Sequence, residues 1–173
     1  MYSLYIYINI YIYIYIQAAR NGHIALCKWL VFEKYIDVNI QTDDLTCALH
    51  FAAYNNQVET CVWLIEEGKC DINILNSFGC NASQWLSING NVQLMNYFKS
   101  KGLNFHIINK NGHSALHKAA IKGNIDAIKW LLSSDGGNLG PLHMYPDDDG
   151  FTPYLFAKNN GHASLAELLE RGE

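Results

Sequence analysis

The sequence carries few charges, and its positive charges are not clustered. Lysine, arginine, aspartate and glutamate make up 16% of the 173 residues, well below the roughly 25% that is typical of soluble domains. The 12 basic residues are scattered among 16 acidic ones, which gives a net charge of −4. A protein that follows nucleic-acid phosphates needs a basic stripe or patch. The composition therefore predicts a protein that does not bind nucleic acid.

The common sequence motifs of catalysis and cofactor binding are also missing. The chain has no glycine-rich phosphate loop, no GxSxG element and no CxxC pair, and its five cysteines are an odd number. These motifs supply the nucleophiles, phosphate cradles and metal ligands of many enzymes. We therefore expect a protein that is not an enzyme and that holds no cofactor and no metal.

Two short patterns resemble metal sites, and we interpret both as structural. His113 and His117 are spaced i, i+4, which can place two ligands on one helix face. However, no glutamate stands beside them and no third ligand is suitably spaced. The run Asp147–Gly150 resembles the start of a calcium loop, which requires a glutamate at its twelfth position. That position is Lys158, so we expect a solvated acidic loop.

The chain repeats one unit about five times. The clearest copy is His113–Leu132, where residues 115–121 and 125–132 predict two short helices joined by a turn at Gly123. The equivalent turn positions are 34, 34, 33 and 38 residues apart, at Gly22, Asn56, Gly90, Gly123 and Gly161. A helix–turn–helix pattern with a period near 33 is the signature of a solenoid, in which each repeat contacts its neighbours.

The repeated motifs resemble those of ankyrin repeats. The segments 48–53 (ALHFAA), 115–120 (ALHKAA), 152–153 (TP) and 71–73 (DIN) match the family's TPLHxAA and GADVN elements. The resemblance covers residues 17–173. It implies an all-α solenoid of about five repeats, with projecting β-turn loops and a truncated first repeat. The expected repeats are 17–41, 42–75, 76–108, 109–145 and 146–173, with an insertion at 135–145.

Several recurring residues are expected to build the scaffold. Glycine or asparagine at the turn supplies a positive φ angle. Alanine pairs such as Ala52-Ala53 allow neighbouring first helices to pack closely. Tryptophan recurs in three second helices, and its strict period favours core packing over a ligand platform. Aspartate and asparagine in the loops are expected to bind loop backbone. These tryptophans and loop residues are Trp29, Trp63, Trp130, Asp37, Asn39, Asp71 and Asn73.

The first 16 residues, MYSLYIYINIYIYIYI, alternate tyrosine and isoleucine. Alternation with period two is typical of a strand, yet both faces would be apolar here. Sixteen residues are also fewer than the roughly 20 that a membrane-spanning helix needs. A TAT-ATA codon repeat would encode the same pattern, so we interpret residues 1–16 as a translated repeat or a wrongly assigned first exon outside the fold. A short anchor and a structural cap remain as alternatives.

The resemblance also implies where a partner would bind. Ankyrin repeats generally bind proteins through their loop tips and the exposed side of their first helices. An apolar patch of Tyr54, Phe78, Ile88 and Ile121 is expected on the middle repeats, where exposed apolar surface marks interaction sites. The predicted partner-binding residues are Asp43, Asp44, Tyr54, Asn55, Ser77, Phe78, Ile88, Asn89, Lys110, Asn111, Ile121, Lys122, Asp148 and Asp149.

The sequence thus predicts a monomeric adapter or scaffold that binds a protein partner. Cys27 and Cys61 occupy equivalent places in neighbouring second helices, whose axes are expected about 8–10 Å apart. A disulfide needs Cα atoms within about 7 Å, so we expect reduced cysteines and a cytoplasmic or nuclear location. The alternative is an interaction module that the Tyr/Ile segment tethers to a membrane.

Overall fold

Ten α-helices form five consecutive helix–turn–helix units in the computed structural model, which describes the backbone of residues 2–171 and the side chains of residues 9–170. This is the predicted all-α solenoid. The units are α1 (Tyr2–Arg20) with α2 (Ile24–Phe32), α3 (Ala48–Tyr54) with α4 (Val58–Glu66), α5 (Ala82–Asn89) with α6 (Val92–Ser100), α7 (Ala115–Lys122) with α8 (Ile125–Leu132), and α9 (Pro153–Asn159) with α10 (Ala163–Arg171).

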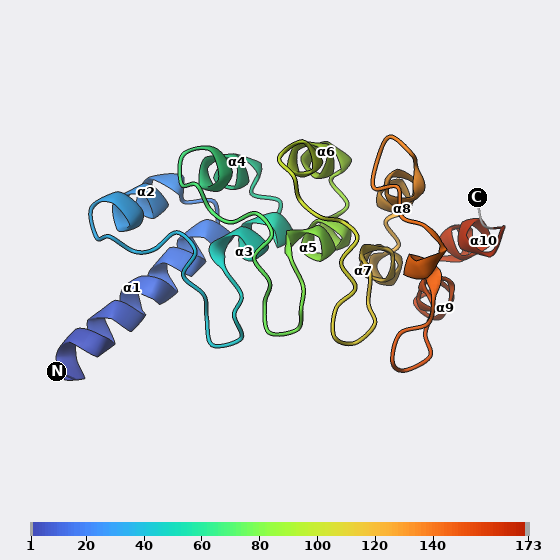
Figure 1. Cartoon of the computed structure of the whole chain (residues 1–173), viewed down its shortest axis with the longest axis horizontal. Coiled ribbons are helices and arrows are strands. Elements are labelled where there is room, and N and C mark those ends of the chain that lie inside the picture. Colours follow the sequence, from blue (N-terminus) through green and yellow to red (C-terminus); the bar gives the residue numbers. More distant parts are fainter. Residues whose placement is uncertain (1, 172–173) are drawn as a thin grey trace.

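The helices are arranged in two rows (Figure 1). The first helices α1, α3, α5, α7 and α9 form one row, and the second helices form the other. Long loops between the units project on the side of the first helices. Within the described residues, extended pairing is limited to one isolated bridge between Gln41 and Cys47. The loops therefore project as turns rather than as paired strands.

The turn within each unit requires a positive φ angle, as the sequence predicted. The φ angles are +78° at Gly22, +84° at Gly90, +74° at Gly123 and +80° at Gly161. Glycine adopts this conformation without a steric penalty because it lacks a Cβ atom. Asn56 has a φ angle of +56°, and asparagine is a residue that tolerates the left-handed region.

Small side chains bring the first helices together. Ala52, Ala53, Ala119 and Ala120 are fully buried, and each pair lies between neighbouring first helices. The third repeat has Leu86 and Ser87 at these positions, and both are fully buried. The Ser87 hydroxyl is satisfied within its own helix, because it donates to the Ser83 carbonyl at 2.7 Å. Close packing thus tolerates one polar atom where that atom finds a local acceptor.

The prediction of a buried tryptophan row is correct for two of its three members. Trp63 and Trp130 are 3% and 8% exposed, whereas Trp29 is 43% exposed. Trp29 lies on α2, the first helix of its row (Figure 1), and packs against Tyr11 of α1, with ring centroids 6.4 Å apart. On the side of α4, Phe32 packs edge-on against Trp63 with ring centroids 6.3 Å apart.

Asparagine side chains join the loops of neighbouring repeats, as expected. The Asn39 carboxamide accepts the backbone N–H of Asp71 at 2.8 Å. One repeat further on, Asn73 accepts the N–H of Asn104 at 2.8 Å. Asp37 accepts the N–H of Asn39 at 2.9 Å within its own loop. These bonds satisfy loop backbone that has no strand partner.

The motif histidines bond the start of their own first helices, and His50 also joins two repeats. His50 accepts the Cys47 N–H at its Nδ1 atom, 3.1 Å away, and its Nε2 atom lies 3.1 Å from the Cys80 carbonyl of the next loop. Gln84 takes this place in the third repeat and donates to the His113 carbonyl at 2.9 Å. His117 binds Ser114 through Nδ1. Burial lowers the pKa of both histidines to about 4, so both are neutral at pH 7.

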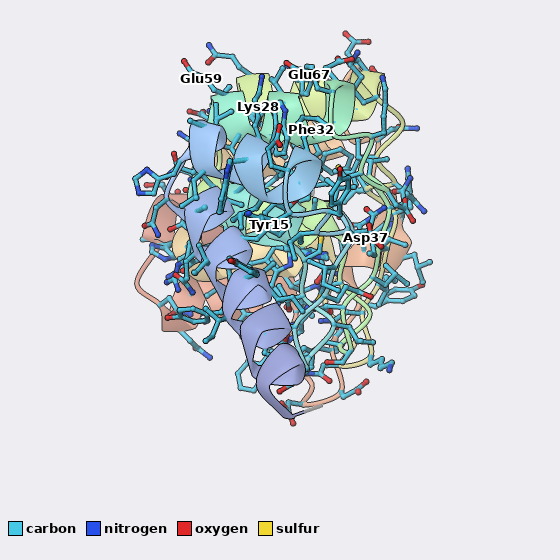
Figure 2. The ribbon with its side chains drawn as sticks, turned by 90° about the vertical axis from the view of Figure 1, so that its left-hand side faces the viewer. Tyr15, Lys28, Phe32, Asp37, Glu59 and Glu67 are labelled. Atoms are coloured by element: carbon cyan, nitrogen blue, oxygen red, sulfur yellow. The ribbon has the colours of Figure 1, made fainter. Side chains whose placement is uncertain are left out.

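The Tyr/Ile segment differs from our expectation. Helix α1 runs through it, and Tyr15 and Ile16 are 0% and 2% exposed within the hydrophobic core. The Tyr15 hydroxyl donates to the Val38 carbonyl at 3.1 Å, and Tyr15 lies where α1 meets the stack (Figure 2). The last turns of the tract therefore supply the first helix that the first repeat would otherwise lack. The start of α1 extends beyond the stack (Figure 1).

The insertion at residues 135–145 folds back over α8 and includes a short 3₁₀ helix, η1 (Pro141–Met144). The Leu139 N–H donates to the Leu131 carbonyl at 2.8 Å, and a Cβ atom at Gly136 would lie 2.0 Å from the Trp130 carbonyl oxygen. Glycine is therefore required where this segment passes the end of α8. Across the described residues, α1 included, we find no helix whose length and apolar character would let it span a bilayer.

Two tyrosines of the tract provide a direct test of its place in the fold. Tyr15 is fully buried, whereas Tyr13 is 66% exposed. We expect Tyr15→Ala to lower the free energy of unfolding by about 3–5 kcal/mol, because it leaves a large cavity. Tyr13→Ala should change it by less than about 0.5 kcal/mol. Urea denaturation measures both, and equally small effects would show that the tract does not contribute to the core.

The two buried histidines predict a pH-dependent stability. An unfolded histidine has a pKa near 6.5, so between pH 6.5 and 4 the unfolded chain binds more protons than the folded one. The contribution of each buried neutral histidine to the free energy of unfolding should therefore be fully present above pH 6.5. Between pH 7 and 5 the free energy of unfolding should fall by up to about 2 kcal/mol per histidine. The double variant His50→Gln/His117→Gln, which copies Gln84, should flatten the profile. Denaturation midpoints with the same pH slope in both proteins would refute this.

Candidate functional site

A hollow of about 270 Å³ lies on the side of the molecule where the loops meet the first helices. We call this side, formed by the loop tips and the exposed faces of the first helices, the inner face. The hollow is bounded by the loops before α5 and α7 and by those two helices. Its lining consists of three apolar side chains, Phe78, Trp85 and Ile88, and of Asn76, Cys80, Gln84, Asn109, Asn111 and Lys118.

The apolar wall belongs to a larger aromatic cluster. Trp85 packs edge-on against Tyr54, with ring centroids 5.5 Å apart, and lies 6.2 Å from Phe51. Phe78 is at the tip of its loop and is 51% exposed. The indole Nε1 of Trp85 is buried and has no partner among the described residues. Tyr54 and Phe78 therefore leave aromatic surface open to solvent on either side of Trp85.

The polar wall is held together by its own hydrogen bonds. The Asn76 side-chain oxygen accepts the N–H groups of Phe78 and Cys80, at 3.1 and 3.0 Å. The Asn109 oxygen likewise accepts those of Asn111 and His113, at 3.0 and 2.8 Å. These bonds shape the two turns. The exposed carboxamide of Asn111, which carries both a donor and an acceptor, is also part of this wall.

Lys118 is the charged residue of the lining. Its Nζ atom lies 2.8 Å from Nδ1 of His113, and Nε2 of His113 lies 2.7 Å from a carboxylate oxygen of Asp147. Because a lysine ammonium can only donate, Nδ1 accepts and the ring proton on Nε2 points to Asp147. Burial lowers the pKa of Lys118.

The Asp147 carboxylate is the fixed end of this chain of contacts. It is 2% exposed, and its second oxygen accepts the Phe151 N–H at 2.8 Å. Burial alone would raise its pKa, but the hydrogen bonds from Phe151 and His113 outweigh burial and lower it. A buried carboxylate and a scaffold histidine thus hold the lysine ammonium at the hollow.

The predicted apolar patch is partly gathered in one place. Phe78 and Ile88 line the hollow, and Tyr54 adjoins it through Trp85. Ile121 lies outside the lining and is half-buried; its carbonyl faces His162 Nε2 at 3.2 Å. Of the predicted polar residues, Asn111 also lines the hollow.

The predicted loop-tip residues form one continuous row. The Ser77 N–H donates to the Asp44 carbonyl at 2.9 Å, the Lys110 N–H to the Phe78 carbonyl at 2.9 Å, and the Asp148 N–H to the Asn111 carbonyl at 3.2 Å. Neighbouring tips are thus joined by one backbone hydrogen bond each. The remaining predicted positions are on loop tips or helix ends beside this row and are exposed or half-buried, namely Asp43, Asn55, Asn89, Lys122 and Asp149.

Both ends of the row are acidic. The first tip carries Asp43 and Asp44, and the last carries Asp148 and Asp149. The pKa of Asp44 is lowered, mainly by a hydrogen bond from the Thr42 hydroxyl. Between these acidic ends stands the tip with Lys110. The middle of the inner face is therefore the part that suits a negatively charged group.

Sequence analysis missed the two most important side chains of the hollow, Trp85 and Lys118. Both stand at the position directly after the motif histidine or its replacement. They precede Ile88 and Ile121 by three residues, and residues spaced i, i+3 share a helix face. That spacing was the available signal.

The two histidines that resembled metal ligands are used by the scaffold. The rings of His113 and His117 stack with centroids 5.5 Å apart and an interplanar angle of 15°. His113 bridges Lys118 and Asp147, while His117 binds Ser114 through Nδ1. Within the described part of the chain, no three His, Cys, Asp or Glu side chains are grouped so that they could hold a metal ion.

Comparison with known proteins agrees with this architecture. No curated protein matches the sequence significantly. A sequence model of the family described as "Ankyrin repeats (3 copies)" matches residues 15–107, 49–143 and 82–173, which together extend from the end of the Tyr/Ile tract through residue 173. The predicted resemblance is thus confirmed, and the chain belongs to the ankyrin-repeat family.

Proposed function

We propose that the chain is a non-enzymatic adapter or scaffold that binds a protein partner through its inner face. Ankyrin repeats are generally protein–protein interaction modules. The observation that supports the proposal most directly is the half-exposed Phe78 beside the Trp85 hollow. Large aromatic side chains near the centre of an interface commonly supply most of its binding energy. In this chain the loop tip that carries Phe78 is joined to its neighbours by backbone hydrogen bonds.

The surface around the hollow favours a protein partner. The hollow measures about 270 Å³, at the lower end of the about 300–1,000 Å³ that small-molecule sites commonly enclose, and this volume also accommodates a single large side chain of a partner. The loop-tip row extends the contact surface beyond the hollow, as a protein interface requires.

The cysteines support a role in a reducing compartment, the cytoplasm or the nucleus. All five are free thiols, and four of them are buried. Burial raises the pKa of Cys27 and Cys70 to about 12. Because the thiolate is the reactive form, these cysteines suit the packed interior rather than chemistry at neutral pH.

The proposal can be tested with the double variant Tyr54→Ala/Phe78→Ala. Loss of two central aromatic side chains should abolish capture of partner proteins from a cell extract, because such anchors each contribute about 2 kcal/mol or more. The helical circular dichroism signal should stay unchanged. Tyr35→Ala/Tyr145→Ala is the matched control, since these tyrosines are 87% and 62% exposed away from the hollow. Unchanged capture by the first variant, or loss of its helical signal, would argue against this site.

A further inference from the structure

We infer that the hollow selects an extended partner segment in which a large apolar side chain stands next to a single carboxylate. This inference rests on the proposed function and adds the chemistry of the partner. The apolar side chain would occupy the space between Phe78, Trp85 and Ile88, and the carboxylate would bind Lys118. Both parts of the site are in the lining of one hollow.

The apolar half of the site is rigid on one side and open on the other. Trp85 is held by Tyr54 and by Phe51 from α3, so its ring does not need to move when a partner binds. Phe78 is exposed at a loop tip, where it can close over a bound side chain. A preformed apolar wall lowers the entropic cost of binding.

The cationic half is positioned before any partner arrives. Lys118 uses one of its three N–H groups on His113 and leaves the others for a ligand. His113 is in turn held by Asp147, which is buried. The negative charge nearest to Lys118 along this chain is thus behind the histidine ring rather than in contact with the ammonium. Among the described residues, no acidic side chain lines the hollow.

The uncharged polar groups of the lining are largely occupied by the protein itself. The oxygens of Asn76 and Asn109 accept backbone N–H groups of their own turns, and the Gln84 oxygen accepts from the Cys80 thiol at 2.8 Å. The Gln84 amide donates to the Ile107 and His113 carbonyls, and the Asn109 amide donates to the Cys80 sulfur. The Lys118 ammonium is therefore the main group left for a ligand, and a carboxylate is a group that only accepts. A cationic ligand would face Lys118.

The surrounding charges limit the partner to few acidic residues. The tip with exposed Lys110 adjoins the tip with Asp148 and Asp149, and the tip with Asp43 and Asp44 lies beyond the one with Phe78. Neighbouring repeats stack about 8–10 Å apart, which is close to the Debye length in physiological salt. A long acidic run would extend toward the aspartates at both ends of the row and be repelled, whereas a single carboxylate at Lys118 brings less negative charge near them.

The test uses the full chain, immobilised, and a synthetic peptide library. Each peptide carries one fixed leucine or phenylalanine, flanked by three randomised positions on either side, and retained peptides are sequenced as a pool. We expect aspartate and glutamate to be enriched at least about fivefold at one flanking position, with basic residues depleted. Lys118→Gln should remove this acidic preference and keep the apolar one. Lys118→Glu should change the preference to lysine and arginine.

Lys129→Gln is the matched control, because Lys129 is exposed on α8, in the row of second helices, and should leave the acidic preference intact. Phe78→Ala should reduce retention of all peptides.

Apolar peptides retained without an acidic preference, or an acidic preference that survives Lys118→Gln, would overturn the inference while the proposed function stands. Retention of no peptide overturns it too, and if extract capture is also insensitive to Tyr54→Ala/Phe78→Ala, the proposed function fails with it. A concentration-dependent dimer that Lys118→Glu abolishes would assign the hollow to a second copy instead.

Discussion

The close approach of neighbouring first helices determines most of this structure. Small side chains are fully buried in these first helices, at Ala52-Ala53, Ser87 and Ala119-Ala120, and add little bulk between them. This spacing fixes the distance between repeats, and with it the distance between the loops that follow. It is short enough for one side chain to reach from a repeat into the next, as Asn39 does when it accepts the Asp71 N–H. The row of loop tips is thus a consequence of helix packing.

Polar groups in the loops depend on the same spacing. A loop without strand partners must satisfy its backbone in another way, and here each repeat does so for its neighbour. Asn39 and Asn73 accept loop N–H groups, while His50 and Gln84 reach carbonyls of the next loop. The end of the stack shows what happens without a neighbour. Trp29 stays exposed although its counterparts Trp63 and Trp130 are buried.

Features that recur in every repeat can be predicted from the sequence. The role of a side chain that occurs in one repeat cannot be predicted in this way. Turn glycines, helix pairs and loop asparagines follow from the period, and the structure has them where the period predicts. The Tyr/Ile segment was expected outside the fold because its alternation is local and matches no repeat motif, whereas in the structure Tyr15 and Ile16, near its end, pack into the core of the stack. The period of the repeats does not single out Trp85 and Lys118, since their position also holds Phe51 and Phe156 in other repeats. Their i, i+3 spacing to Ile88 and Ile121 indicates a shared helix face, but it does not indicate that two repeats line one hollow.

The difference between recurring and single positions indicates how a repeat scaffold can carry a specific hollow. The position after the motif histidine differs between repeats: in the third it supplies an apolar wall, Trp85, and in the fourth a charge, Lys118. The charge is costly to bury without a partner, and the scaffold lowers this cost through His113 and Asp147, which belong to the loops of the fourth and fifth repeats. The hollow therefore depends on three consecutive repeats, although its apolar wall and its charge each come from a single one.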